Sequence, residues 1–360
     1  MTNPLSEFPE LGCYLLPGHT DNPADIISEV RQAERLGLGS AWISERFDVK
    51  EAASLAGAAG AVTDRICIGT AATNINTRHP LVTASMATTL HKLTHGRFAL
   101  GIARGVGIRG DLMGLTPQTN AHLKEFVELM HKLWRGERVS HQGKLGDFPY
   151  LHMKDGMSAD IPLMFVGFGI KSLEMAGGLF DGVILHTFLS DDALQRSVRA
   201  VRRGAEVAGR DPATVKVWSV LATSCNDDDE AVLRKIVARM ATYMQAPGYG
   251  ELLFASNEWD PELLKAFRAD SVVASMSGGI DSVATLEQLR HIRDLIPAYC
   301  LPAAVGSPEQ CAQRFVDQFD AGADGIIIHA STADEFAPVI TAYKACRDSK
   351  RFADRTNRPV

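Results

Sequence analysis

Residues 66–107, ICIGTAATNINTRHPLVTASMATTLHKLTHGRFALGIARGVG, decide the fold that this sequence predicts. The stretch opens with an apolar run at Ile66–Ile68, and a helical pattern of leucine and alanine then extends from Pro80 to a stop at Gly96. Phe98–Ala103 alternates large and small side chains, which predicts a strand with one nearly bare face. Because a strand–helix–strand unit crosses over right-handed, the loops after its two strands lie side by side at one sheet edge. Ligands of α/β proteins bind at that edge.

The composition is typical of a globular enzyme. The chain has 360 residues, of which 46% are hydrophobic and 22% charged, and its net charge of -6 argues against nucleic acid or an anionic membrane as the main partner. No apolar run reaches membrane-spanning length, and no signal pattern precedes the first strand, so we expect a cytoplasmic protein with a small-molecule substrate. The six cysteines show no CxxC spacing, which favours structural thiols over disulfides or a metal site.

The alternation of strand and helix continues along the whole chain. Eight apolar runs are each followed by a helical pattern, at residues 11–16, 40–44, 66–68, 98–103, 162–166, 182–186, 215–222 and 325–329. This rhythm predicts one α/β domain over residues 1–360, a (β/α)8 TIM barrel. Two segments interrupt it, an excursion at 135–160 with a hairpin and a long helical insertion at 223–321 before the last strand. A doubly wound open sheet fits less well, because no early GxGxxG turn is present.

A set of short motifs, met in order along nearly the whole chain, resembles the bacterial luciferase-like superfamily and, within it, the F420-dependent oxidoreductases. The motifs are AERLG at 33–37, AWISERF at 41–47, RHP at 78–80, GRFALG at 96–101, AG at 176–177 with DG at 181–182, GSPE at 306–309 and AGADG at 321–325. Each motif is short, so the ordered set carries the resemblance.

The resemblance implies that the deazaflavin coenzyme F420 lies across the carboxyl-end mouth of the barrel. Ala71 and Ala72 match a bulge, often a non-prolyl cis peptide, that presses on one face of the ring, and Gly167–Gly169 match a turn under the phosphate-bearing tail. The arginines that flank the glycine loop, Arg104 and Arg109, are candidates to neutralise that phosphate. The expected cofactor contacts are Glu45, Arg46, Ala71, Ala72, Asn74, Arg104, Gly105, Val106, Gly107, Gly167, Phe168 and Gly169.

Two positions depart from the family's sugar-phosphate dehydrogenases, which carry histidine where this chain has Arg46 and glutamate where it has Val106. Arginine does not deprotonate in proteins, so Arg46 cannot replace the histidine as a general base. It could instead steady an anionic reduced ring or hold a carboxylate. We therefore expect a substrate other than a sugar phosphate.

Hydride transfer also requires a group that holds or moves a proton beside the substrate. The titratable residues just past predicted strand ends are His19, Glu45, His186 and His329. Our catalytic candidates are Glu45, Arg46, His19 and His186. For each, a structural or cofactor-contacting role is the alternative.

The segment Ser277–Ser282, SGGIDS, resembles a different family, because it is similar to the pyrophosphate-binding loop of ATP-pyrophosphatases. In that family the loop opens a domain and a whole sheet follows it. Only about eighty residues follow here, and their pattern belongs to the end of the barrel. A helix-capping turn at Asp281 or Ser282, or an anion contact over the barrel mouth, is therefore favoured over ATP chemistry.

The function that the sequence predicts is hydride transfer between F420 and an unidentified small organic substrate, by a homodimer. The first alternative is a luciferase-like monooxygenase that uses reduced FMN, which the same fold supports. A second alternative is a barrel that binds its ligand without turnover.

Overall fold

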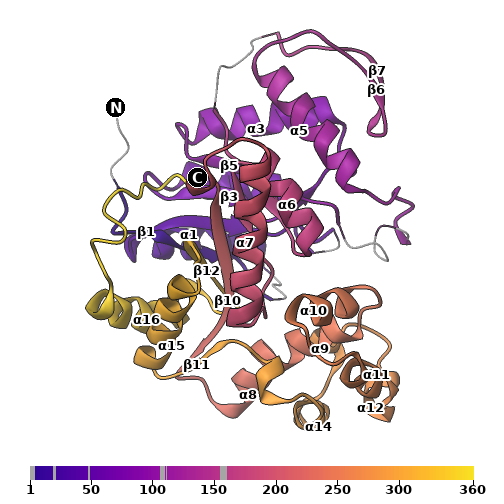
Figure 1. The fold of residues 1–360 in the computed structure, drawn as a ribbon. Helices are drawn as coiled ribbons and strands as arrows, with labels where there is room; N and C mark the ends of the chain where they lie inside the picture. The colour runs from indigo at the N-terminus through magenta and orange to yellow at the C-terminus, as the bar shows by residue number, and fades with distance from the viewer. Residues whose placement is uncertain (1–4, 19–21, 48, 106–109, 111, 155–159) are drawn as a thin grey trace.

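A computed structural model describes residues 5–18, 22–47, 49–105, 110, 112–154 and 160–360. Eight parallel strands close into a barrel, because β9 pairs with both β8 and β10 (Figure 1). The barrel strands are β1 (Phe8–Tyr14), β2 (Leu38–Ile43), β3 (Cys67–Thr70), β5 (Phe98–Ala103), β8 (Leu163–Val166), β9 (Gly182–Ile184), β10 (Lys216–Cys225) and β12 (Gly325–His329). The predicted (β/α)8 barrel is confirmed.

Helices follow the strands and cover the outside of the barrel (Figure 1). They are α1 (Ile26–Arg35), α2 (Ala52–Ala61), α3 (Pro80–Leu93), α5 (Asn120–Trp134), α6 (Ile170–Leu179), α7 (Asp191–Val207), α15 (Pro308–Asp320) and α16 (Ala333–Cys346). Single turns of 3₁₀ helix are η1 (Pro23–Asp25), η2 (Pro212–Thr214) and η4 (Ala298–Cys300). The excursion after α5 contains the expected hairpin, β6 (Val139–Gly143) with β7 (Gly146–Leu151).

The predicted bare face of β5 comes close to the backbone of β3 at Gly101. A side-chain carbon at Gly101 would lie 1.9 Å from the backbone oxygen of Thr70, so only glycine fits there. The Thr70 hydroxyl donates to the Gly101 carbonyl at 2.8 Å and accepts from the Gly101 N–H at 2.9 Å. A short strand, β4 (Thr73–Asn74), then continues the pairing with β5 and carries the following loop to the barrel mouth.

Two tryptophans fill the barrel interior. Trp42 and Trp218 are fully buried and meet edge to face, with ring centroids 6.2 Å apart. Each ring lies over a glycine, since a side-chain carbon at Gly69 or at Gly325 would lie 2.4 Å from the tryptophan. The barrel is therefore a packed core and not a pore.

The C-terminal segment crosses the opposite end of the barrel from the mouth. The Trp218 indole N–H donates to the Pro359 carbonyl at 2.8 Å, and Val360 packs against the interior residues. Asn357 accepts from the Ser6 N–H and donates to the Arg65 carbonyl, each at 2.9 Å. This segment, residues 355–360, closes the amino-end face of the barrel, and we call it the tail.

The insertion after β10 forms a group of short helices below the barrel in Figure 1. It comprises α8 (Asp229–Val232), the π-helical turn η3 (Leu233–Val237), α9 (Ala238–Gln245), α10 (Tyr249–Asn257), α11 (Pro261–Ala269), α12 (Ser271–Ala274), α13 (Ile280–Val283) and α14 (Leu286–Leu295). The prediction that residues 223–321 are helical throughout is wrong at two places. β10 runs to Cys225, past the predicted strand end at residue 222, and β11 (Ala304–Gly306) is a further strand that pairs with it. Over the described residues, no helix is both long and apolar enough to cross a bilayer.

Candidate active site

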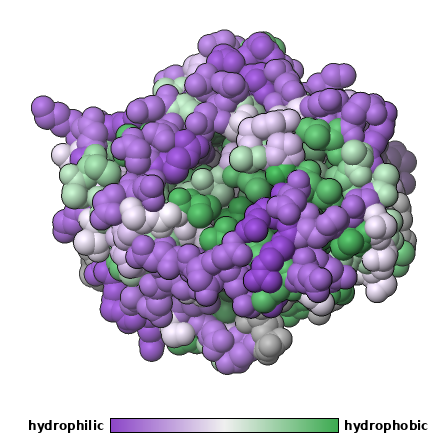
Figure 2. Space-filling model, turned by 90° about the horizontal axis from the view of Figure 1, so that it is seen from below, coloured by the Kyte–Doolittle hydropathy of each residue, from purple (hydrophilic) through white to green (hydrophobic). Residues whose placement is uncertain are grey.

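A cavity of about 890 Å³ lies at the carboxyl ends of the barrel strands. Its walls come from the segments that follow six of the barrel strands, β1, β2, β3, β5, β8 and β9, and from Val220 on β10 and His329 at the end of β12. Residues of α9 and α10 and the turn at α13 complete the lining. On the face of the molecule that carries the insertion, hydrophobic side chains line a hollow with a mostly hydrophilic border (Figure 2). The insertion therefore roofs the mouth of the barrel.

Most of the predicted site residues reach this cavity. Those that line it are Glu45, Arg46, Ala71, Ala72, Asn74, Arg104, Gly105, Gly167, Phe168, His186 and His329. Gly169 lies outside the lining as the N-cap of α6, with a φ of 95°. The candidates His19, Val106, Gly107 and Arg109 lie outside the described residues.

The peptide bond between Ala71 and Ala72 is cis, in agreement with the resemblance. The Ala71 N–H donates to the Ile43 carbonyl at 2.8 Å, and the Ala72 carbonyl accepts from the Glu45 N–H at 3.1 Å. The ends of β2 and β3 thus hold both alanines at the cavity wall.

The Glu45 carboxylate is held on several sides and is almost fully buried, with 4% of its side chain exposed. Arg78 donates to both of its oxygens at 2.9 Å, and the Thr73 hydroxyl also donates to it. Arg78 pairs in addition with Glu51, the N-cap of α2. Glu45 therefore fixes the loop after β3 onto the end of β2, while its predicted contact with a cofactor stays a prediction.

Two cations lie beside the end of β1. Arg46 donates to the Gly18 carbonyl at 2.7 Å, and its backbone pairs with that of Lys50. The Lys50 ammonium donates to the Leu16 carbonyl at 2.7 Å, and burial, aided by Arg46, lowers the pKa of Lys50 to about 8. Sequence reasoning missed Lys50, since a lysine before a helix ordinarily stays in solvent.

His186 is held in one tautomer. Its Nδ1 lies 2.6 Å from the Thr187 carbonyl, which can only accept, so Nδ1 carries the proton. Nε2 is in hydrogen-bond contact with the Tyr249 hydroxyl. Burial lowers the pKa of His186 to about 4, and Arg239 acts in the same direction, so the imidazole is neutral at pH 7.

Four aromatic rings pack into one cluster on this wall. The ring of His186 lies 4.6 Å from Phe168, 4.8 Å from Tyr243 and 5.2 Å from Tyr249, and the two tyrosines stack at 5.2 Å. Burial raises the pKa of both tyrosines, so both are neutral. The tyrosines come from the insertion, and no sequence signal separates them from ordinary core aromatics.

His329, at the end of β12, faces the same cavity. Its ring meets Tyr14 edge to face at 5.3 Å. Its Nδ1 is buried and has no hydrogen-bond partner among the described residues. Burial holds the pKa of His329 well below its usual value, helped by Arg239 and His186.

The roof carries a buried ion pair. Arg239 on α9 lies 2.7 Å from the Asp281 carboxylate and over the ring of Tyr243, 6.0 Å from its centroid. Asp281 belongs to the SGGIDS segment, which follows α12 and runs into α13, and its backbone N–H donates to the Thr242 hydroxyl at 2.9 Å. The ATP-pyrophosphatase resemblance fails here, because a helix and not a sheet strand precedes the segment. Gly279, Asp281 and Ser282 instead line the cavity.

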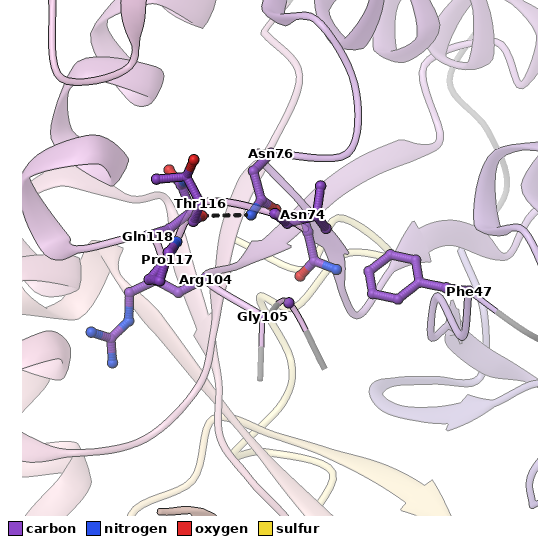
Figure 3. Close-up of a pocket in the computed structure, with 10 residues that line it drawn as sticks. Phe47, Asn74, Asn76, Arg104, Gly105, Thr116, Pro117 and Gln118 are labelled. Carbon is purple, nitrogen blue, oxygen red and sulfur yellow. Dashed lines mark hydrogen bonds between the residues drawn. The ribbon is translucent and has the colours of Figure 1, made fainter. Parts of the chain in front are cut away.

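A smaller side pocket of about 240 Å³ adjoins the cavity and shares Phe47, Asn74, Arg104 and Gly105 with it. Figure 3 shows Asn74 between Phe47 and the segment 116–118, where Asn76 donates to the Thr116 carbonyl at 3.0 Å. Burial lowers the pKa of Arg104, which still carries its charge at pH 7. The described residues contain no cluster of histidine, cysteine or acidic side chains suited to a metal ion.

The barrel, with a cavity of buried cations, neutral histidines and tyrosines at the carboxyl ends of its strands, defines a TIM-barrel enzyme. The chain belongs to the luciferase-like monooxygenase family, whose family model matches residues 9–325. It is therefore an oxidoreductase of the luciferase-like type.

Relatives with known activities have sequences or folds similar to this chain. A 5,10-methylenetetrahydromethanopterin reductase from Methanolobus tindarius is 26% identical over 310 residues, which cover 85% of this chain and 91% of the relative. An F420-dependent glucose-6-phosphate dehydrogenase from Nakamurella multipartita is 33% identical over 205 residues, 52% of this chain and 60% of the relative. The solved coenzyme F420-dependent tetrahydromethanopterin reductase from Methanopyrus kandleri has the same fold, with a TM-score of 0.76, 20% identity and coverage of 95% and 99%.

Proposed function

We propose that this protein is an F420-dependent oxidoreductase that transfers a hydride between F420 and a small organic substrate. The observation that carries the proposal is the convergence, on one cavity, of most of the residues that the resemblance assigns to cofactor contact. The F420-dependent relatives support the choice of cofactor.

The wall of the cavity fits a flat cofactor ring that carries a phosphate-bearing chain. Gly105 has a φ of 83°, and a side-chain carbon there would lie 3.4 Å from the Asn74 amide oxygen. A side-chain carbon at Gly167 would lie 2.9 Å from the Phe165 ring. Both glycines line the cavity, so backbone and no side chain borders a ring at these two positions. Arg104 also lines the cavity and supplies a cation for the phosphate of the cofactor.

Each group of residues has a role in this proposal. Bound F420 would supply the hydride acceptor or donor. Arg46 and Lys50 would stabilise negative charge on the ring, and Glu45 keeps the Ala71–Ala72 segment in place through Arg78. The aromatic cluster of Phe168, Tyr243 and Tyr249 excludes water, while neutral His186 is available to hold a proton.

The second candidate is an FMN-dependent monooxygenase. A solved monooxygenase of this fold, the oxygenating constituent of 3,6-diketocamphane monooxygenase from Pseudomonas putida, contains FMN and has a TM-score of 0.64 at 20% identity. Such an enzyme needs reduced FMN from a separate reductase, and it consumes oxygen.

Titration with oxidised F420 and, separately, with FMN tests the choice, with quenching of cofactor fluorescence as the readout. We expect F420 to bind at micromolar concentration or below and FMN to bind at least tenfold more weakly. Arg104→Gln should weaken F420 binding by about tenfold, the effect of losing one charge-assisted contact. Arg199→Gln, an exposed arginine on α7, is the matched control and should bind as the unmodified chain does. Preference for FMN would select the monooxygenase, and failure of both cofactors would overturn both candidates.

Homodimerisation and a cytoplasmic location belong to the same proposal, and the family resemblance supports them. Sedimentation velocity at micromolar concentration should give a dimer, and a monomer at that concentration would contradict it.

A further inference from the structure

The positions of two hydrogen atoms follow from the contacts of His186. The Thr187 carbonyl takes the proton of Nδ1, and the neutral ring has no second proton. Nε2 must therefore accept, and the Tyr249 hydroxyl must donate to it. The Tyr249 oxygen is left with its acceptor positions free for another group.

Both partners of this hydrogen bond line the cavity, and their surroundings fix them there. Phe168 packs on one side of His186, and Tyr243 stacks on Tyr249. Tyr249 is the first residue of α10, directly after Gly248, whose φ of 76° turns the chain into the helix. The pair therefore keeps its geometry without a ligand, as a preorganised site requires.

We propose that Tyr249 and His186 form a proton relay that accepts the hydroxyl proton of an alcohol substrate while that alcohol is oxidised to a carbonyl compound. The inference rests on the proposed function, which supplies oxidised F420 as the hydride acceptor. An alcohol is the substrate class that the hydrogen positions select, because the Tyr249 oxygen accepts a hydrogen bond from a hydroxyl but has no free hydrogen for a carbonyl.

The step balances in atoms and electrons. The substrate C–H bond breaks, and its electron pair leaves with the hydrogen as hydride to oxidised F420. The substrate O–H bond breaks, a carbonyl double bond forms, and the proton makes a new O–H bond at Tyr249. The original Tyr249 proton moves to Nε2, so His186 ends with a proton on each nitrogen. Burial disfavours the Tyr249 phenolate, so the two proton transfers take place together and no phenolate forms.

Turnover with alcohols tests the relay directly. Oxidised F420 is mixed with ethanol, 2-propanol, cyclohexanol or benzyl alcohol, and loss of F420 absorbance is followed. We expect at least one alcohol to react. Tyr249→Phe should lower kcat by about 100-fold, the usual contribution of a proton-transfer group, with F420 affinity within threefold. Tyr243→Phe, which removes a neighbouring hydroxyl without touching the His186 hydrogen bond, should lose far less.

Chemical rescue separates proton transfer from support of the fold. His186→Ala should lose activity to a similar degree and regain part of it with added imidazole, whereas a structural defect would not respond. The absence of rescue in a variant that unfolds at the same urea concentration as the unmodified chain would overturn the role of His186.

A measurement on the protein without substrate gives an independent test. ¹⁵N NMR of the histidine side chains at pH 7 should show His186 protonated at Nδ1 and bare at Nε2, and Tyr249→Phe should shift the Nε2 resonance without changing the tautomer. A proton on Nε2 would overturn the relay. Absence of F420 binding would defeat the proposed function, whereas F420 binding without turnover of any alcohol would defeat this inference alone.

Discussion

His186 and His329 are neutral histidines in the wall of one cavity, and each takes up a proton more readily once the chain unfolds. Burial lowers the pKa of His186 from 6.5 to about 4 and holds that of His329 well below 6.5. Between these values and 6.5 the unfolded chain binds protons that the folded chain does not, so the free energy of unfolding falls as the pH falls. The full contribution is present above pH 6.5 and is lost towards pH 4.

We expect His186 alone to remove about 3 kcal/mol of stability between pH 7 and pH 4. Urea unfolding at a series of pH values measures this loss. His186→Gln and His329→Gln should each reduce the dependence of the free energy of unfolding on pH, because glutamine does not titrate. His95→Asn, a change at an exposed histidine with a φ of 52° that asparagine tolerates, is the surface control with which both slopes are compared. Equal slopes in all four proteins would contradict the prediction.

The residues of the site differ in how far the sequence could place them. Glu45, Arg46 and Asn74 follow strands directly, so strand prediction alone brings them to the barrel mouth. Lys50 and Tyr249 reach the cavity through a turn and through a helix of the insertion. Their contacts depend on tertiary packing, and no periodic pattern in the sequence predicts such contacts. The tautomer of His186 could be assigned only from the position of the Thr187 carbonyl oxygen, which the sequence does not give.

At the scale of elements, the periodic strands and helices of the barrel were predictable, and the roof was not. Eight strand–helix pairs recur with clear hydrophobic periods, whereas α8 to α14 are short and follow one another without strands. The orientation of such helices is set by packing on the barrel, so their inward side chains could not be selected beforehand.

One contact between elements explains the AERLG motif. The Glu34 carboxylate at the end of α1 accepts hydrogen bonds from the backbone N–H groups of Asp64, Arg65 and Ile66, at 2.9, 2.7 and 3.0 Å. The contact ties α1 to the start of β3 and satisfies three donors with one side chain.

We expect Glu34→Gln to lower the free energy of unfolding by about 1–2 kcal/mol, since an amide oxygen replaces a charged acceptor. Urea denaturation of purified protein measures the change. Glu206→Gln, an exposed glutamate on α7, is the matched control and should change stability by less than about 0.5 kcal/mol. Similar effects of the two substitutions would show that the hydrogen bonds to Glu34 add little.

For the whole molecule, the tail joins parts of the chain that are distant in sequence. It connects Pro359 to Trp218 and Asn357 to the segments before β1 and β3. Arg355 lies over the Trp218 ring, with 5.5 Å between its guanidinium carbon and the ring centroid. The tail thus covers the Trp218 ring at the amino end of the barrel.

Removal of residues 355–360 should expose Trp218 to water, lower Tm by roughly 5 °C or more and shift tryptophan emission to longer wavelength. Differential scanning calorimetry and fluorescence provide the two readouts. Arg358→Ala removes a contact with the exposed Asp160 and should change Tm little. Unchanged emission after removal of the tail would show that it does not shield the indole.

The roof of the cavity is encoded in one uninterrupted stretch of the chain, between β10 and β11, whereas the strand ends beneath it are scattered over the whole sequence. Two recombination events between related genes, one on each side of that stretch, would exchange Arg239, Tyr243 and Tyr249 together. The strand ends of the barrel would stay as they are. Such an exchange would renew the whole roof of the cavity as one unit, and chimaeric genes joined at the same borders would test in the laboratory whether the choice of substrate follows the roof.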